Sequence, residues 1–151
     1  IAGGAPREDF KNRSYLGKTN TAANEADLDI VIDTKKAMGE KPVVVVVRMH
    51  HPMVMAELEP YADAILVDFG VEQRAVLKLI SGKEEPQGML PVQLPIDMEE
   101  VETHFEDMPL DMRAYVDTEG HSYDFGYGLN WSGVIEDERK FKYVKNTSKT
   151  Y

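Results

Sequence analysis

A polar cluster, Arg48-Met49-His50-His51-Pro52, directly follows five consecutive valines. Arginine carries a fixed positive charge, and histidine can donate, accept or transfer a proton, so these side chains can bind a polar ligand or assist a reaction. Adjacent residues of an extended segment point in opposite directions, so His50 and His51 rarely share one metal ion. The cluster therefore predicts a ligand-binding or interface role for Arg48, His50 and His51, and no metal site.

Other common site types find little support in the sequence. A dinucleotide fingerprint needs a third glycine and a helix start, and Gly3-Gly4 provides neither. A Ser-His-Asp triad would need a nucleophile elbow, and the chain contains no Gly-x-Ser-x-Gly segment. We expect no metal and no organic cofactor.

The valine run is the element that would position the polar cluster. Val43–Val47 consists of β-branched residues, which are poorly suited to a helix and favour a strand. The run does not alternate apolar with polar residues, which predicts a strand buried on both faces between two layers of helices. Open α/β sheets bind ligands at the carboxyl ends of their strands, where the cluster would lie.

Helical and strand patterns alternate around this strand. The expected elements are a helix capped by Asn24 and ended by Gly39, a helix from Pro52 to Leu58 ended by Pro60, a strand Ala64–Val67, a helix from about Glu72 to Ser81, an edge or irregular segment Met89–Leu94 that contains Pro91, and a hairpin around the turn Asp117–Gly120. This order implies parallel strands joined by right-handed crossovers. The predicted fold class is α/β: a three-layer α/β sandwich with a mostly parallel sheet flanked by helices, and an antiparallel strand or hairpin near the C-terminus.

Composition excludes several partners. The 151 residues carry a formal net charge of −10, which repels nucleic acid and anionic membranes. No apolar run approaches the roughly 18 residues that a membrane span needs.

The absence of cysteine fits a reducing compartment, and we expect a cytoplasmic protein. Between Asp97 and Asp117 there are eight acidic residues and one basic residue, Arg113, which predicts a solvated acidic face.

The two ends of the chain differ from its middle. The start, Ile1-Ala2-Gly3-Gly4, has no methionine and resembles the end of a strand, so we expect a piece of something longer. A polar stretch around Glu8 and Asp9 has no clear period and is expected to be a loop. We expect one domain over residues 1–135 and a polar tail over residues 136–151.

Three segments form a set of motifs whose order and spacing are specific only together. They are Ala62–Val67, the segment from Gly82 through Pro86-Gln87-Gly88-Met89-Leu90-Pro91-Val92 to Pro95, and Tyr123-Asp124-Phe125-Gly126-Tyr127-Gly128-Leu129. Through these segments the chain resembles the C-terminal α/β domain of family 3 glycoside hydrolases, the β-glucosidase-like enzymes. The resemblance covers roughly residues 1–135 and implies an α/β sandwich that packs on an N-terminal (β/α) barrel.

The resemblance also implies a reaction. In the family the barrel provides the carboxylate nucleophile, and in many members a loop of the C-terminal domain provides the general acid/base; a retaining glycosidase needs the two carboxyl groups about 5–5.5 Å apart. That loop reads Glu-Gly-x-Asp-Arg in many members. The nearest match in this chain, residues 8–13, has one extra residue, lacks the glycine and has Asn12 in place of aspartate. By this alignment Glu8 is the acid/base and Asp9 the alternative.

The resemblance thus implies a part of a β-glucosidase-like hydrolase that acts on β-glycosides. Its partners would be a carbohydrate substrate and a (β/α) barrel domain or a second chain, and it could form a homo-oligomer. Arg48, His50 and His51 would face the sugar or the barrel. The chain alone would hold at most half of the catalytic pair. Two alternatives remain open: a non-catalytic docking domain that keeps the fold, and an unrelated doubly wound domain that binds a small anion.

Overall fold

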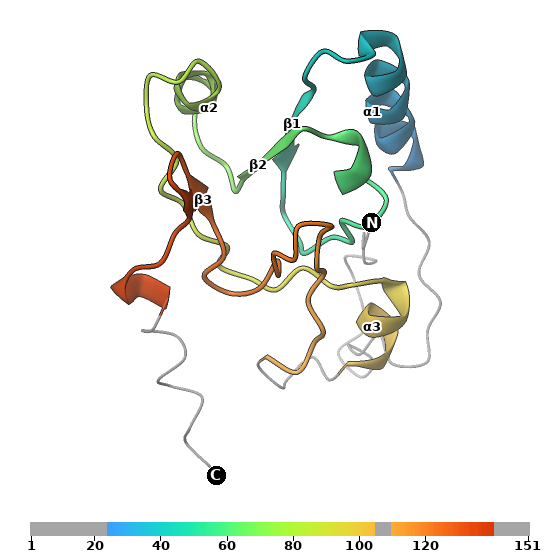
Figure 1. Cartoon of the computed structure of the whole chain (residues 1–151). Coiled ribbons are helices and arrows are strands. Elements are labelled where there is room, and N and C mark those ends of the chain that lie inside the picture. Colours follow the sequence, from blue (N-terminus) through green and yellow to red (C-terminus); the bar gives the residue numbers. More distant parts are fainter. Residues whose placement is uncertain (1–23, 105–109, 141–151) are drawn as a thin grey trace.

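The computed structural model of the protein describes residues 24–104 and 110–140 (Figure 1). Its elements are α1 (Glu25–Met38), β1 (Val44–Arg48), the 3-10 helix η1 (Glu59–Tyr61), β2 (Ala64–Asp68), α2 (Gln73–Ile80), α3 (Met98–Thr103), β3 (Leu129–Asn130) and β4 (Gly133–Val134). Figure 1 shows α1 and α2 on either side of the β1–β2 pair. None of the helices in these two ranges is long and apolar enough to cross a membrane.

The strand pairing confirms the α/β class. β1 and β2 are parallel, with Val44 opposite Ala64 and Arg48 opposite Asp68. β3 and β4 form a separate antiparallel pair near the C-terminus. The predicted hairpin is also present as an antiparallel bridge between Val116 and Ser122.

The helix α1 follows the predicted bounds, but its predicted cap is wrong. The side chain of Asn24 makes no capping bond, and its buried Oδ1 has no hydrogen-bond partner among the residues that the structure describes. The backbone carbonyl of Asn24 instead accepts the N–H groups of Asp27 and Leu28. At the other end, Lys35 Nζ lies 2.6 Å from a carboxylate oxygen of Asp63, which also accepts the N–H of Val43 at 2.7 Å. This carboxylate ties the helix to the start of both strands.

The prediction that the valine strand is buried on both faces is wrong for the described residues. Val44 and Val46 are 43% and 41% exposed, whereas Val45 and Val47 pack against the core. A run of valines predicts a strand, but it does not predict which face of the strand is covered. β-branched side chains occur in strands at both buried and exposed positions. One face of β1 is therefore covered within the described part of the chain and the other is open.

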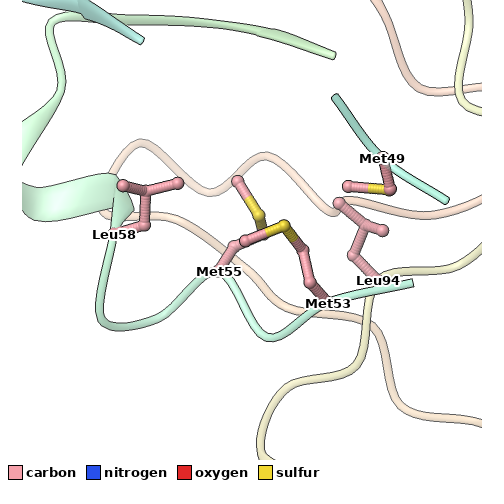
Figure 2. Close-up of a cluster of buried hydrophobic side chains, with 5 residues drawn as sticks. All are labelled: Met49, Met53, Met55, Leu58 and Leu94. Atoms are coloured by element: carbon pink, nitrogen blue, oxygen red, sulfur yellow. The ribbon is translucent and has the colours of Figure 1, made fainter. Parts of the chain in front are cut away.

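The predicted helix from Pro52 to Leu58 is absent, and this segment is irregular. A buried cluster explains the difference: Met53 and Met55 from this segment meet Met49, Leu58 and Leu94 (Figure 2). A helix would bury one stripe of side chains, but here closely spaced apolar residues all turn inward. The proline at position 60 does not end a helix; it lies in the first turn of η1, where its missing N–H costs nothing.

The segment Met89–Leu94 is irregular, as its proline predicted, and it is held by residues Tyr123–Leu129, which we call the closing motif. Leu90 donates its N–H to the carbonyl of Tyr127 at 2.7 Å and accepts the N–H of Gly126 at 2.9 Å. Leu94 donates to the carbonyl of Tyr123 at 3.0 Å. The two motif segments, far apart in sequence, therefore satisfy each other's backbone groups.

Candidate functional site

An arginine–carboxylate pair ties the carboxyl ends of β1 and β2 together. Arg48 donates from Nε and Nη2 to one carboxylate oxygen of Asp68, both at 3.1 Å. The other oxygen accepts the N–H groups of Gly70 at 2.6 Å and Val71 at 2.7 Å. The hydrogen bonds from Val71 and Gly70, with help from Arg48, lower the pKa of Asp68 although burial opposes them. A carboxylate that is 5% exposed thus fixes the loop after β2.

The structure places the three predicted binding residues at the expected end of the sheet. Arg48 forms an ion pair with Asp68, and its Nη2 lies 3.4 Å from the carbonyl of Val71, so Arg48 positions the loop after β2. His50 and His51 are exposed in the loop that follows β1. Contact of these side chains with a sugar or a barrel stays a prediction.

The two predicted acid/base residues, Glu8 and Asp9, lie outside the described residues. Neither side chain is therefore placed relative to the carboxyl ends of β1 and β2. The catalytic role of both residues stays a prediction that depends on the alignment of residues 8–13 with the family loop.

The loop at the sheet end also presents apolar side chains. Phe69 and Val71 are each 50% exposed, although the backbone that carries them is fixed by Asp68. An ordered loop with exposed apolar side chains is better prepared for contact than a flexible one, because less conformational freedom is lost on binding. The sequence signal for this loop was Asp68-Phe69-Gly70 directly after a strand, but the hydrogen bonds of the carboxylate were not predicted.

Glu100 is an exception to the expected solvated acidic face. Glu100 is 7% exposed and accepts the backbone N–H of Arg113 at 2.9 Å and its Nε at 2.6 Å. The hydrogen bond with Glu100, followed by its charge, raises the pKa of Arg113. Asp97 caps α3 by accepting the N–H of Glu100 at 2.8 Å. The signal that could have revealed the pair was the single basic residue within an acidic stretch.

Four aromatic rings form a cluster between the hairpin and the closing motif. The centroids of Tyr115 and Tyr123 lie 5.4 Å apart, those of Tyr123 and Tyr127 lie 5.1 Å apart, and the ring of His121 stacks on Tyr127 at 5.8 Å. The hydroxyl of Tyr115 donates to Glu59 at 3.1 Å. These rings hold the predicted hairpin against the closing motif, which explains why aromatic residues recur there.

Metal chemistry has no support from the described part of the chain. Within it, no group of three or more histidine and carboxylate side chains lies close enough to hold a metal ion.

Comparison with known families shows which family the chain belongs to. Residues 8–131 match the domain described as "Glycosyl hydrolase family 3 C-terminal domain". The chain belongs to this family. The family 3 resemblance carried by the three motif segments is thereby confirmed, and the unrelated small-anion-binding alternative loses its support.

Relatives with curated names agree with the family. A "Probable beta-glucosidase C" from Aspergillus flavus is 35% identical over 105 residues, which are 66% of this chain and 16% of the relative. A "Putative beta-xylosidase" from Formosa agariphila is 33% identical over 133 residues, which are 83% of this chain and 17% of the relative. A "Periplasmic beta-glucosidase/beta-xylosidase" from Dickeya chrysanthemi is 24% identical over 120 residues, 80% of this chain and 17% of the relative. The family 3 domain thus spans about one sixth of these relatives, and no solved structure matches it.

Proposed function

We propose that this family 3 domain supplies the general acid/base of a retaining β-glycosidase. Glu8, or Asp9 in its place, protonates the leaving oxygen and then activates the water that releases the sugar. The attacking carboxylate belongs to a (β/α) barrel domain or a second chain. The observation that carries the proposal is the family match, which begins at Glu8, together with the names of the relatives as β-glucosidases and β-xylosidases.

We infer that the acid/base loop acts beside the end of the β1–β2 sheet. Arg48 and Asp68 fix the strand ends and the loop after β2, and His50 and His51 are exposed beside them. A loop that carries a proton donor is useful only if the surface around it is rigid, because proton transfer requires hydrogen-bond distances. We assign His50 and His51 to contact with the sugar or with the barrel at this surface.

A complementation assay tests the acid/base assignment. The chain is mixed with a barrel-containing partner and a chromogenic β-glucoside, and the assay is repeated with Glu8→Ala and Asp9→Ala. Loss of the acid/base lowers the rate by about 10²–10⁴-fold, because a general acid contributes that much. Asp33→Ala, which removes an exposed carboxylate on α1, is the matched control and keeps the rate.

Two outcomes would contradict the proposal. Activity that needs the chain but tolerates both Glu8→Ala and Asp9→Ala would show that neither residue is the acid/base. Hydrolysis by the chain alone would show that the attacking carboxylate is not supplied from outside it.

A second function, a non-catalytic docking domain, is favoured by one observation. The outer face of β1 exposes Val44 and Val46, and a surface of this kind suits contact with another domain or chain. In the complementation assay this function predicts that the chain raises the stability of the partner while both acidic substitutions leave the rate unchanged. A homo-oligomer and a cytoplasmic location stay predictions.

A further inference from the structure

One side of the β1–β2 pair is an aliphatic surface that the described residues leave partly open. Val44 and Val46 are 43% and 41% exposed, and they lie opposite Ala64 and Leu66 in the parallel ladder. Because side chains alternate along a strand and paired residues share a side of the sheet, these four side chains lie together. The other side, which includes Val45, packs on the core. We call the four side chains the outer face.

Helix α2 carries a second aliphatic surface. Leu77 and Ile80 are 64% and 47% exposed, and Val76 lies on the same side of the helix, one turn before Ile80. None of the eight residues of α2 is buried. An amphipathic helix of an α/β domain packs such a stripe on a sheet. Figure 1 shows α2 beside the β1–β2 pair, and its stripe of Val76, Leu77 and Ile80 is still open.

The loop between β2 and α2 connects the two surfaces. It exposes half of the side chains of Phe69 and Val71, while the carboxylate of Asp68 fixes its backbone. Apolar side chains are thus presented from the strand pair through this loop to α2. Exposed apolar patches of this kind mark interaction sites, and a fixed backbone lowers the entropy that contact costs.

The distribution of charge favours a second copy of this chain as the occupant. The chain carries a net charge of −10, so two copies repel each other over most of their surfaces. Helix α2 is different, because its charged residues are Arg74 and Lys78, which are both positive. The outer face has no charged side chain. Two copies that meet through these surfaces bring no carboxylates of the helix or the face together.

The two surfaces are also complementary in kind. The outer face is a sheet surface that lacks a helix, and the α2 stripe is a helix surface that lacks a sheet. In a two-fold dimer the same two surfaces meet twice, so α2 of each copy lies on the outer face of the other. A second copy therefore covers both surfaces at once.

We propose that two copies of this chain form a two-fold dimer in which the α2 stripe of each copy covers the outer face of the other. The dimer does not depend on Glu8, on Asp9 or on any sugar, so it and the proposed function can fail separately. A barrel domain that binds to the same surfaces is the rival occupant.

Sedimentation velocity of the 151-residue chain tests the dimer. Between about 2 and 200 µM we expect a monomer–dimer equilibrium with a Kd on the order of 10 µM, as suits a small interface. Leu77→Glu weakens the dimer by about 100-fold or more, because the contact would bury an unpaired carboxylate. Ile30→Glu is the matched control, because Ile30 on α1 is also 64% exposed. It leaves the Kd unchanged.

A second variant changes the sheet side of the contact. Val46→Thr keeps a β-branched side chain in the strand and weakens the dimer by about tenfold, because a hydroxyl is then buried. Circular dichroism checks that each variant is folded, and Val46→Thr decides the question if Leu77→Glu does not fold.

Engineered cysteines locate the contact, because the chain has no cysteine of its own. An equimolar mixture of Leu77→Cys and Val46→Cys should form an intermolecular disulfide under mild oxidation, since the two side chains approach each other across the interface. A mixture of Ile30→Cys and Val46→Cys should give a much lower yield.

Four results would overturn the proposal. They are a monomer at every concentration, equal effects of Leu77→Glu and Ile30→Glu, equal disulfide yields in the two mixtures, and a chain that stays monomeric but loses affinity for a barrel-containing partner after Leu77→Glu. The last result would assign the outer face and the α2 stripe to the barrel.

Discussion

A β-carbon added to Gly128 would overlap the backbone carbonyl oxygen of Gly88 and lie 3.2 Å from its carbonyl carbon. The closing motif and the segment Gly82–Pro95 cross at this point, and the Leu90–Tyr127 and Leu90–Gly126 hydrogen bonds lie next to the crossing. The glycine of the closing motif is thus required by close approach of two backbones.

Gly128→Ala is expected to destabilise the domain by about 1–3 kcal/mol, since the backbone of the partner segment cannot move aside as a flexible side chain would. Gly88→Ala is the matched control, because a β-carbon there meets nothing within 4 Å and Gly88 has no positive φ. Denaturant unfolding followed by circular dichroism measures both. Equal loss of stability in the two variants would show that the crossing is not close.

The sequence predicted the parallel pair and the helices around it because those elements depend on local patterns. Val43–Val47 and Ala64–Val67 are short apolar runs rich in β-branched residues, and α1 and α2 each have an apolar stripe with a glycine after the last turn. Patterns of this kind lie within a few residues of one another, so no tertiary information is needed to recognise them.

The wrong predictions concern burial and long-range contacts. Met53 and Met55 lie in a segment whose residue types favour a helix. In the structure the segment is irregular, and both side chains are buried because the core at that point requires them. The partner of Glu100 lies 13 residues away, and the partner of Arg48 lies 20 residues away on the neighbouring strand. The spacing along the chain does not reveal such pairs, so the electrostatics of the candidate site could be recognised only from the structure.

Removal of the Asp68 charge is expected to loosen the loop at the sheet end. In Asp68→Asn the amide no longer offers a charged acceptor to Arg48 and to the N–H groups of Gly70 and Val71. We expect a lower melting temperature and much faster hydrogen exchange at the Gly70 and Val71 amides, measured by NMR. Asp33→Asn, an exposed carboxylate on α1, should change neither. Unchanged exchange at Gly70 and Val71 would mean that the carboxylate does not order the loop.

The Glu100–Arg113 pair is expected to stabilise the packing of α3. Glu100→Ala leaves the backbone N–H of Arg113 without its acceptor, at a cost of about 1–3 kcal/mol. Because the Arg113 side chain is 67% exposed and can be solvated after the change, the lower end of this range is expected. Thermal unfolding compares it with Glu99→Ala, which removes an exposed carboxylate of the same helix. A larger effect from Glu99→Ala would contradict this account.

Acid should destabilise the domain through its paired aspartates. Hydrogen bonds lower the pKa of Asp68 and Asp63, and those from His121 lower the pKa of Asp117 despite its burial. A group whose pKa is lower in the folded state stabilises it above the unfolded value of 3.8, and this stability is lost as the pH falls through the folded value. The melting temperature is therefore expected to be level near pH 6 and to fall below about pH 4. Asp68→Asn should flatten that fall, and a profile identical to wild type would exclude Asp68 as a contributor.

Alkaline conditions should act on the ring cluster in the opposite direction. Burial raises the pKa of Tyr127 to about 12 and raises that of Tyr123 further. A tyrosine whose pKa is higher in the folded state contributes stability that is complete below the unfolded value of 10.0 and disappears as the pH rises through the folded value. The domain is expected to unfold between about pH 10 and 12, with a cooperative rise in tyrosinate absorbance near 295 nm. Tyr127→Phe keeps the ring beside His121 and Tyr123 but cannot ionise, so it should move this transition to higher pH. Tyr61→Phe, which changes an exposed tyrosine of η1, should not move it. If all tyrosines titrate near pH 10 while the circular dichroism of the folded chain persists, the cluster that holds the hairpin against the closing motif is open to solvent.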